Sequence, residues 1–122
     1  MMQKLFAYAR DTYQSEPEYL WAKTPEAAVL RNGKNQKWYA VFLNVSREKL
    51  GLKEKESVWI VNLKCDPLFM GSLLEMDGYY PAYHMNKNHW ISILLDGTVE
   101  EEQLRNLLDL SYQLTENRRK KS

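Results

Sequence analysis

The stretch SVWIVNLKC, Ser57–Cys65, has the clearest regular pattern in this 122-residue chain. One set of alternate side chains is entirely apolar: Trp59, Val61, Leu63 and Cys65. The other set becomes polar toward its C-terminal end: Val58, Ile60, Asn62 and Lys64. A period of two is typical of a β-strand. We therefore expect a strand with one face in the core and with Asn62 and Lys64 on the other face.

Upstream of this strand, the sequence predicts a hairpin between two apolar runs, residues 27–31 and 37–45. The polar sequence NGKNQ separates the two runs. Asn32 and Gly33 both tolerate a positive φ, which predicts a tight turn at this pair. Strands joined by tight turns favour an antiparallel sheet.

Strict alternation along residues 37–45 divides the side chains of this run between two faces. It places Tyr39 on the face of Val41, and Trp38 on the opposite face with Ala40. Both faces are largely apolar near the middle of the run, as expected for a central strand.

Three helices are expected around these strands. Residues 3–14 and 99–116 have apolar side chains at helical spacing. Asp66 is a good N-cap and Pro67 a good first residue for a helix between them, and we expect that helix to end at Asp77-Gly78. Its apolar residues should form a buried stripe: Leu68, Phe69, Leu73 and Leu74.

The stretch PAYHMNKNHW, residues 81–90, contains both histidines of the chain. We expect a strand at 89–95, and we expect residues 83–85 to pair with it across a tight turn at 86–88. The stretch therefore predicts a polar hairpin that leads into a core strand.

Together these elements predict an α+β fold, in which an antiparallel sheet forms one layer and helices pack mainly on one of its faces as a second layer. At this length we expect a single domain over residues 1–117. A basic tail should follow at residues 118–122.

The charge balance and the cysteine content limit the classes of protein to which the chain can belong. The chain has 17 basic and 16 acidic residues, which is mildly unfavourable for a nucleic-acid binder because phosphate neutralisation needs a local excess of Lys and Arg. Its single cysteine, Cys65, excludes an internal disulfide and favours the cytoplasm. We expect no signal peptide and no membrane span, and we expect a monomer that carries no cofactor.

An enzyme would need Cys65 as a nucleophile and His84 or His89 as a base. We favour a packed core thiol because Cys65 continues the apolar face of its strand. No glycine-rich phosphate loop and no G-x-S-x-G sequence are present. The two histidines are five residues apart and lack a zinc-ligand pattern. We therefore expect neither an active site nor a metal site.

The polar and aromatic residues could instead form a nucleic-acid interface on the uncovered face of the sheet. Rings would stack on bases, lysines would meet phosphates, and amides would form hydrogen bonds. The candidates are Lys37, Trp38, Lys64, Tyr83, His84, Asn86, Lys87, His89 and Trp90. Two alternatives stay open. The aromatics could be core residues beside a simple turn, or the region around His84 and His89 could line a polar-aromatic cleft for a protein or small ligand.

Several segments, in order along the chain, resemble the MmcQ/YjbR family of small bacterial proteins: EPEYLW, KWYAVFLNV, KLGL, NLKCDP, GYYPAYHMNKNHWISILLDGTV and LLDLSYQLT. The resemblance covers nearly the whole chain. It implies a helix, an antiparallel sheet and further helices, similar to secretion-chaperone-like domains. It also implies DNA binding through a likeness to a double-wing arrangement, with no catalytic activity attached and no established list of contact residues.

Overall fold

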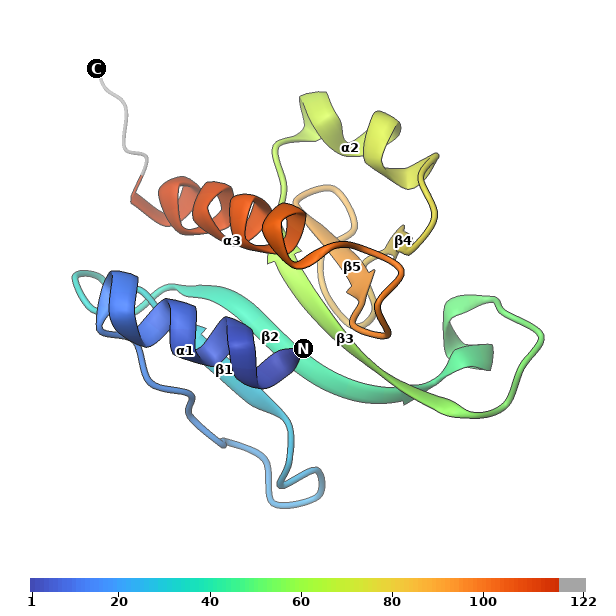
Figure 1. Cartoon of the computed structure of the whole chain (residues 1–122), viewed down its shortest axis with the longest axis horizontal. Coiled ribbons are helices and arrows are strands. Elements are labelled where there is room, and N and C mark those ends of the chain that lie inside the picture. Colours follow the sequence, from blue (N-terminus) through green and yellow to red (C-terminus); the bar gives the residue numbers. More distant parts are fainter. Residues whose placement is uncertain (117–122) are drawn as a thin grey trace.

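The computed structural model describes residues 1–116, which form a five-stranded antiparallel sheet with helices beside it (Figure 1). The strands are β1 (Ala28–Arg31), β2 (Trp38–Ser46), β3 (Ser57–Lys64), β4 (Tyr79–Pro81) and β5 (Trp90–Leu94). Their order in the sheet is β1-β2-β3-β5-β4, so the strand with the clearest alternation, β3, is central. The basic tail expected at 118–122 lies outside the described residues.

The helices are α1 (Met2–Tyr13), α2 (Pro67–Leu74) and α3 (Glu101–Glu116), and a short 3₁₀ helix, η1 (Arg47–Leu50), connects β2 to β3. In Figure 1, α1 and α3 lie side by side over the sheet, and α2 stands apart from them near β4. No helix in residues 1–116 is long and apolar enough to cross a membrane. The predicted α+β architecture is confirmed.

The sheet face under α1 and α3 is closed by apolar packing. Phe6 of α1 meets Phe42 of β2 edge to face, with ring centroids 4.8 Å apart. Val61 and Leu63 of β3, which were expected to face the core, are buried in the same cluster with Leu108 of α3. This cluster is the main core of the protein.

A group of tyrosines around one carboxylate joins α1 to α3. The hydroxyls of Tyr8 and Tyr13 both donate hydrogen bonds to Asp109, and those from Tyr8 measure 2.9 and 2.8 Å. The ring of Tyr13 stacks on Tyr112, with centroids 3.9 Å apart. Burial, and then the bond to Asp109, raises the pKa of Tyr13. Tyr13 therefore remains a protonated donor at neutral pH and keeps the two helices together.

The start of β2 departs from strict alternation. The pairing register with β1 shifts here, and Tyr39 is left between the paired residues Trp38 and Ala40 as the extra residue of a bulge. Tyr39 is therefore fully buried on the helix face, and Trp38 packs in the cluster on the opposite face. The prediction for these two side chains was wrong because an inserted residue reverses the alternation that follows from a regular strand.

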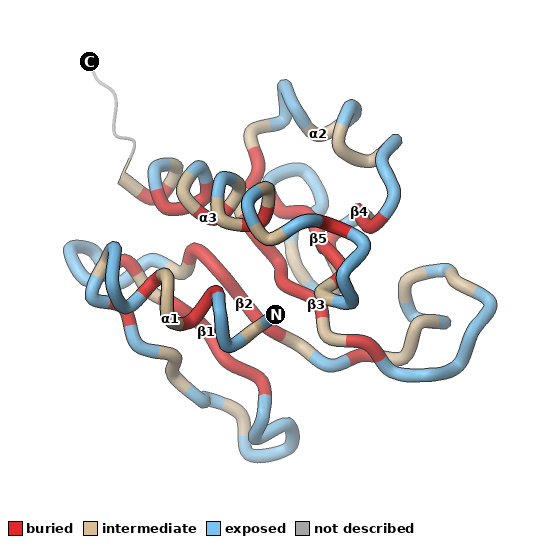
Figure 2. Tube along the Cα trace, viewed as in Figure 1, coloured by how far each residue is buried: buried red, intermediate tan, exposed pale blue. Residues whose placement is uncertain are grey.

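The burial predicted for α2 was also wrong. The helix begins as expected, with Asp66 Oδ1 accepting a hydrogen bond from the Leu68 N–H at 2.9 Å. It ends at Leu74 rather than at Asp77-Gly78, and none of its residues is buried (Figure 2). The expected stripe is exposed or half-buried: Leu68 (85% exposed), Phe69 (56%), Leu73 and Leu74. Apolar spacing predicts which side of a helix needs a partner, but not that a partner is present.

The partner of β5 is β4 rather than residues 83–85. Pro81 of β4 lies opposite Ile91 of β5, whereas residues 83–85 belong to a loop. His84 has a φ of 61°, in the left-handed region that a regular strand cannot contain.

The turn between β1 and β2 also differs from the expectation. Its positive φ is at Gln36 (66°) and not at Asn32 or Gly33. Asn32 is fully buried, and its Nδ2 donates to Thr115 Oγ1 of α3 at 2.9 Å. Its polar side chain therefore ties the turn to the helix layer.

Candidate nucleic-acid interface

The sheet face opposite the helices is covered in part by the loop of residues 82–89. Asn62 Nδ2 donates to the carbonyl of Tyr83 at 2.9 Å, and the Tyr83 N–H donates to Ser92 Oγ at 2.9 Å. The Ser92 hydroxyl in turn donates to Asn62 Oδ1. Asn62 and Ser92 are fully buried. The expectation of an uncovered face was therefore wrong, because the polar end of β3 holds a loop over it.

Lys64 and Trp90 lie together at one end of this face. They are paired across β3 and β5, and Lys64 Nζ lies 5.1 Å from the centre of the Trp90 ring, within cation–π range. The pKa of Lys64 is lowered, mainly by burial and to a lesser extent by the charge of Lys37. Lys37 is thus an electrostatic neighbour of Lys64. Neither lysine forms an ion pair within residues 1–116.

A second cation–aromatic pair lies beside the first. The guanidinium of Arg31 is 5.8 Å from the centre of the Trp38 ring, and Arg31 Nε also pairs with Glu18 Oε1 at 3.2 Å. Trp38 meets Trp21 edge to face, with centroids 5.9 Å apart. Trp38 and Trp90 belong to one apolar cluster, so the two cations are held over neighbouring indoles.

The loop of residues 82–89 adds a third lysine. Lys87 Nζ donates to the carbonyl of Ala82 at 2.8 Å, and Ala82 is buried in the same cluster as Trp90. At the loop tip, Asn86 Oδ1 accepts a hydrogen bond from the Asn88 N–H at 2.8 Å. Asn86 therefore shapes the turn, as side-chain amides often do, and Lys87 is anchored beside the indoles.

We call the residues around this cluster the basic-aromatic surface: Arg31, Lys37, Trp38, Lys64, Lys87 and Trp90. Five of the six were expected from the sequence, and Arg31 was missed. The predicted hairpin could have identified Arg31, because a residue at the end of the first strand lies opposite the start of the second.

The remaining candidates lie beside this surface. The ring of His84 packs on that of half-buried Tyr83, with centroids 3.8 Å apart. His89 is exposed, and its carbonyl accepts a hydrogen bond from the Cys65 N–H at 2.8 Å. Within residues 1–116, no three His, Cys, Asp or Glu side chains gather as a metal site.

A separate cavity of about 510 Å³ lies between α2 and α3. Its wall is mostly apolar and includes Phe69, Leu107 and Leu114, but neither His84 nor His89. The sequence analysis did not identify it. The sequence feature that could have predicted the cavity is the number of apolar side chains. The helix α2 has more of them than one buried stripe requires, and Leu107 and Leu114 widen the apolar stripe of α3.

Comparison with known proteins identifies the family. The YjbR family model matches residues 10–114. The chain belongs to the YjbR family. The Bacillus subtilis protein YyaQ is 41% identical over 111 residues, which are 91% of this chain and 94% of YyaQ. Escherichia coli YjbR is 36% identical over 67 residues, which are 54% of this chain and 57% of that protein. The family expected from the sequence segments is therefore confirmed.

Solved structures of YjbR-like proteins share the fold. A crystal structure of a Pseudomonas syringae protein matches with a TM-score of 0.90 at 40% identity, covering 94% of this chain and 98% of that chain. The Deinococcus radiodurans protein DR2400 matches with a TM-score of 0.73 at 24% identity, covering 97% and 80%. YyaQ and E. coli YjbR are both described as uncharacterized. Membership of the YjbR family therefore establishes the fold of this chain but not its function.

Proposed function

We propose that this YjbR-family chain is a non-enzymatic, monomeric protein of the cytoplasm that binds double-stranded DNA through its basic-aromatic surface. The observation that supports this most is geometric: Lys64 Nζ lies 5.1 Å from the centre of the Trp90 ring, and the Arg31 guanidinium lies 5.8 Å from that of Trp38 in the same cluster. The charge of Lys37 adds to burial in lowering the pKa of Lys64, and no acidic side chain in residues 1–116 pairs with either lysine. A phosphate placed between two such cations relieves their repulsion.

Phosphate contacts should dominate this binding. Trp90 is only 8% exposed, and Lys64 lies over its ring, so the indole holds a cation in place and is not free to stack on a base. One N–H of the Lys87 ammonium donates to the carbonyl of Ala82. An ammonium group has three N–H donors, so two remain for a phosphate. Phosphate contacts read no base sequence. We therefore expect weak sequence preference.

The test is fluorescence anisotropy of a labelled duplex across a salt series. The protein should bind with a Kd of roughly 1–100 µM at physiological salt and more tightly at lower salt, and log Kd should rise linearly with log salt. The double variant Lys37→Met/Lys64→Met should reduce the slope by about two, because each phosphate contact adds about one.

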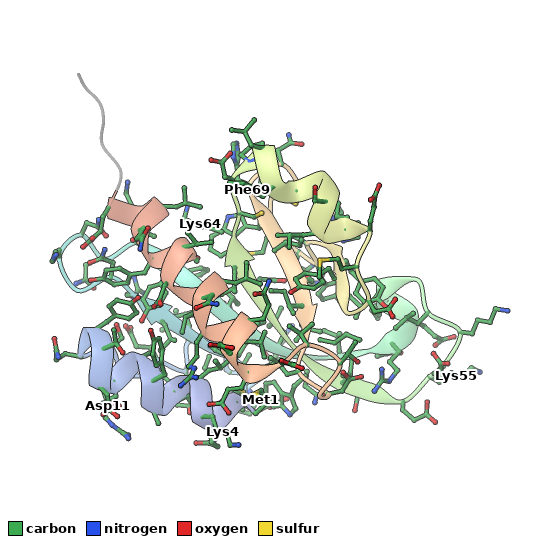
Figure 3. The ribbon with its side chains drawn as sticks, turned by 45° about the horizontal axis from the view of Figure 1, so that its top comes forward. Met1, Lys4, Asp11, Lys55, Lys64 and Phe69 are labelled. Carbon is green, nitrogen blue, oxygen red and sulfur yellow. The ribbon has the colours of Figure 1, made fainter. Side chains whose placement is uncertain are left out.

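The matched control removes two exposed lysines from the connection between β2 and β3, as Lys53→Met/Lys55→Met. Figure 3 shows Lys55 at the far end of the molecule from Lys64. This control has the same net charge as the test variant and should retain the parent slope. The proposal is wrong if the duplex stays free at about 1 mM protein in low salt, or if both double variants reduce the slope equally.

A further inference from the structure

The positive charge of this chain is concentrated in its basic tail, residues 118–122. Four of the 17 basic side chains and none of the 16 acidic ones lie in this tail. Residues 1–117 therefore have 13 basic and 16 acidic side chains. A body with a net negative charge repels a polyanion such as DNA, so the basic-aromatic surface alone has to bind phosphates against the charge of the rest of the fold.

The last turn of α3, which precedes the tail, is fixed to the turn between β1 and β2. Asn35 Nδ2 donates to the Thr115 carbonyl at 2.9 Å, and Lys34 Nζ pairs with Glu116 Oε2 at 2.8 Å. Glu116 is the last residue of the helix and of the described structure. The point from which the chain continues toward the tail is therefore held at this turn.

The same turn leads directly to Lys37 of the basic-aromatic surface. The amide of Asn35 contacts both sides, since its Oδ1 accepts a hydrogen bond from the Lys37 N–H at 3.0 Å while its Nδ2 donates to Thr115. One helical turn earlier, Ser111 Oγ accepts a hydrogen bond from the Lys64 N–H at 2.9 Å. Figure 1 shows the turn and the end of α3 at the same end of the molecule. The C-terminal half of α3 is thus joined to the backbone at both lysines.

The tail is long enough to act with these lysines on one duplex. Its four cations are the second to fifth residues after Glu116. Because a chain spans at most roughly 3.3–3.6 Å per residue, they can extend up to roughly 18 Å from the end of α3. A duplex has one charge per roughly 1.7 Å of its axis, so several phosphates beside Lys37 and Lys64 fall within this distance.

We propose that the basic tail is a second phosphate-binding segment of the DNA site and that it binds the phosphates beside those bound by Lys37 and Lys64. The inference rests on the proposed function, because it extends that site. It adds four residues outside the basic-aromatic surface: Arg118, Arg119, Lys120 and Lys121. The tail changes the balance of the chain from an excess of acidic to an excess of basic side chains, and it therefore makes the approach to DNA favourable.

The test is the salt-series titration of a labelled duplex with the parent chain and with the tail variant Arg118→Gln/Arg119→Gln/Lys120→Gln/Lys121→Gln. Each lost phosphate contact lowers the slope of log Kd against log salt by about 0.9. The tail variant should therefore lower the slope by about three to four, which is more than the reduction of about two expected for Lys37→Met/Lys64→Met. It changes no residue of the described structure.

The matched control removes four exposed lysines from elsewhere on the fold and has the same net charge as the tail variant. Figure 3 places Lys4 and Lys55 far from Lys64. Lys49 and Lys53 are exposed in the connection between β2 and β3, which also contains Lys55. The control is Lys4→Gln/Lys49→Gln/Lys53→Gln/Lys55→Gln, and it should lower the slope by less than about one.

A second pair of variants tests the position of the tail rather than its charge. About twelve Gly and Ser residues, inserted between Glu116 and Asn117, separate the tail from the anchored end of α3 and leave the net charge unchanged. Because the local concentration of a tethered group falls roughly as the −3/2 power of linker length, the Kd for the duplex should rise about fivefold. The same linker added after Ser122 should leave the Kd unchanged.

The outcomes separate this inference from the proposed function. A parent-like slope for the tail variant, an equal reduction by its matched control, or a parent-like Kd with the inserted linker would overturn the inference alone. If the tail variant loses the slope while Lys37→Met/Lys64→Met keeps that of the parent, the tail binds DNA by itself. The proposed function and the inference then both fail, as they do if the parent does not bind the duplex.

Discussion

The two faces of β3 differ in what their side chains do, although they alternate along one strand. Val61 and Leu63 are buried under α1 and α3 in the main core. Asn62 holds the loop of residues 82–89, and Lys64 presents a cation over Trp90. Successive residues of one central strand therefore serve different roles, one in stability and the next in recognition. We expect substitutions on the helix face to affect folding and those near Lys64 to affect binding.

The largest effect should come from the helix face. Phe42 is fully buried against Phe6, so Phe42→Ala should lower the free energy of unfolding by about 3–5 kcal/mol through lost burial and a residual cavity. Its neighbour Leu43 points to the other face and is only half-buried. Leu43→Ala should cost about 1 kcal/mol. Urea denaturation measures both, and equal costs would contradict the proposed difference between the faces.

A smaller effect is expected where the loop is held. Asn62→Ala leaves the Tyr83 carbonyl without its donor and the Ser92 hydroxyl proton without its acceptor, and it should cost about 2 kcal/mol. Amide hydrogen exchange in residues 82–89 should accelerate, because the loop loses its anchor. The exposed Asn44 of β2 is the matched control, and Asn44→Ala should change neither quantity. Unchanged exchange in the Asn62 variant would show that other contacts hold the loop.

The smallest stability effect should come from the residue that we propose for binding. At pH 7, Lys64→Met should change the free energy of unfolding by less than about 1 kcal/mol, although DNA affinity falls. Because burial and Lys37 lower the native pKa of Lys64 below 10.5, the unfolded chain binds more protons between that native value and 10.5. The parent should therefore gain stability relative to the variant as pH rises through this window. A constant difference from pH 7 to pH 11 would contradict the assigned environment.

The elements of the fold were predictable from the sequence, because alternation, helical spacing and capping are local. β3, the hairpin of β1 and β2, and the amphipathic helices α1 and α3 were all expected near their observed bounds. The errors arose where one residue changes the geometry. The extra residue Tyr39 reversed two side chains of β2, and the left-handed backbone of His84 excluded a strand at residues 83–85.

The candidate site was predictable in its residue types but not in its arrangement. Lys64 and Trp90 were both expected, but their cation–π contact depends on the register of β3 and β5. The cavity depends on the exposure of Phe69, which no element within residues 1–116 covers, whereas Leu73 and Leu74 of the same helix pack against the main core. Neither the register nor an absent neighbour is encoded in a local pattern, so both required the tertiary structure.

DNA binding by the basic-aromatic surface can be tested directly by following individual lysine side chains by NMR during titration with a short duplex at low salt. Signals of the ε-methylene groups can be assigned from single Lys→Met variants. We predict that Lys37, Lys64 and Lys87 shift together as DNA binds. Lys4 and Lys55, which Figure 3 places far from Lys64, should remain unchanged. Shifts concentrated at Lys4 or Lys55, or no lysine shift at saturating duplex, would show that the basic-aromatic surface does not bind DNA.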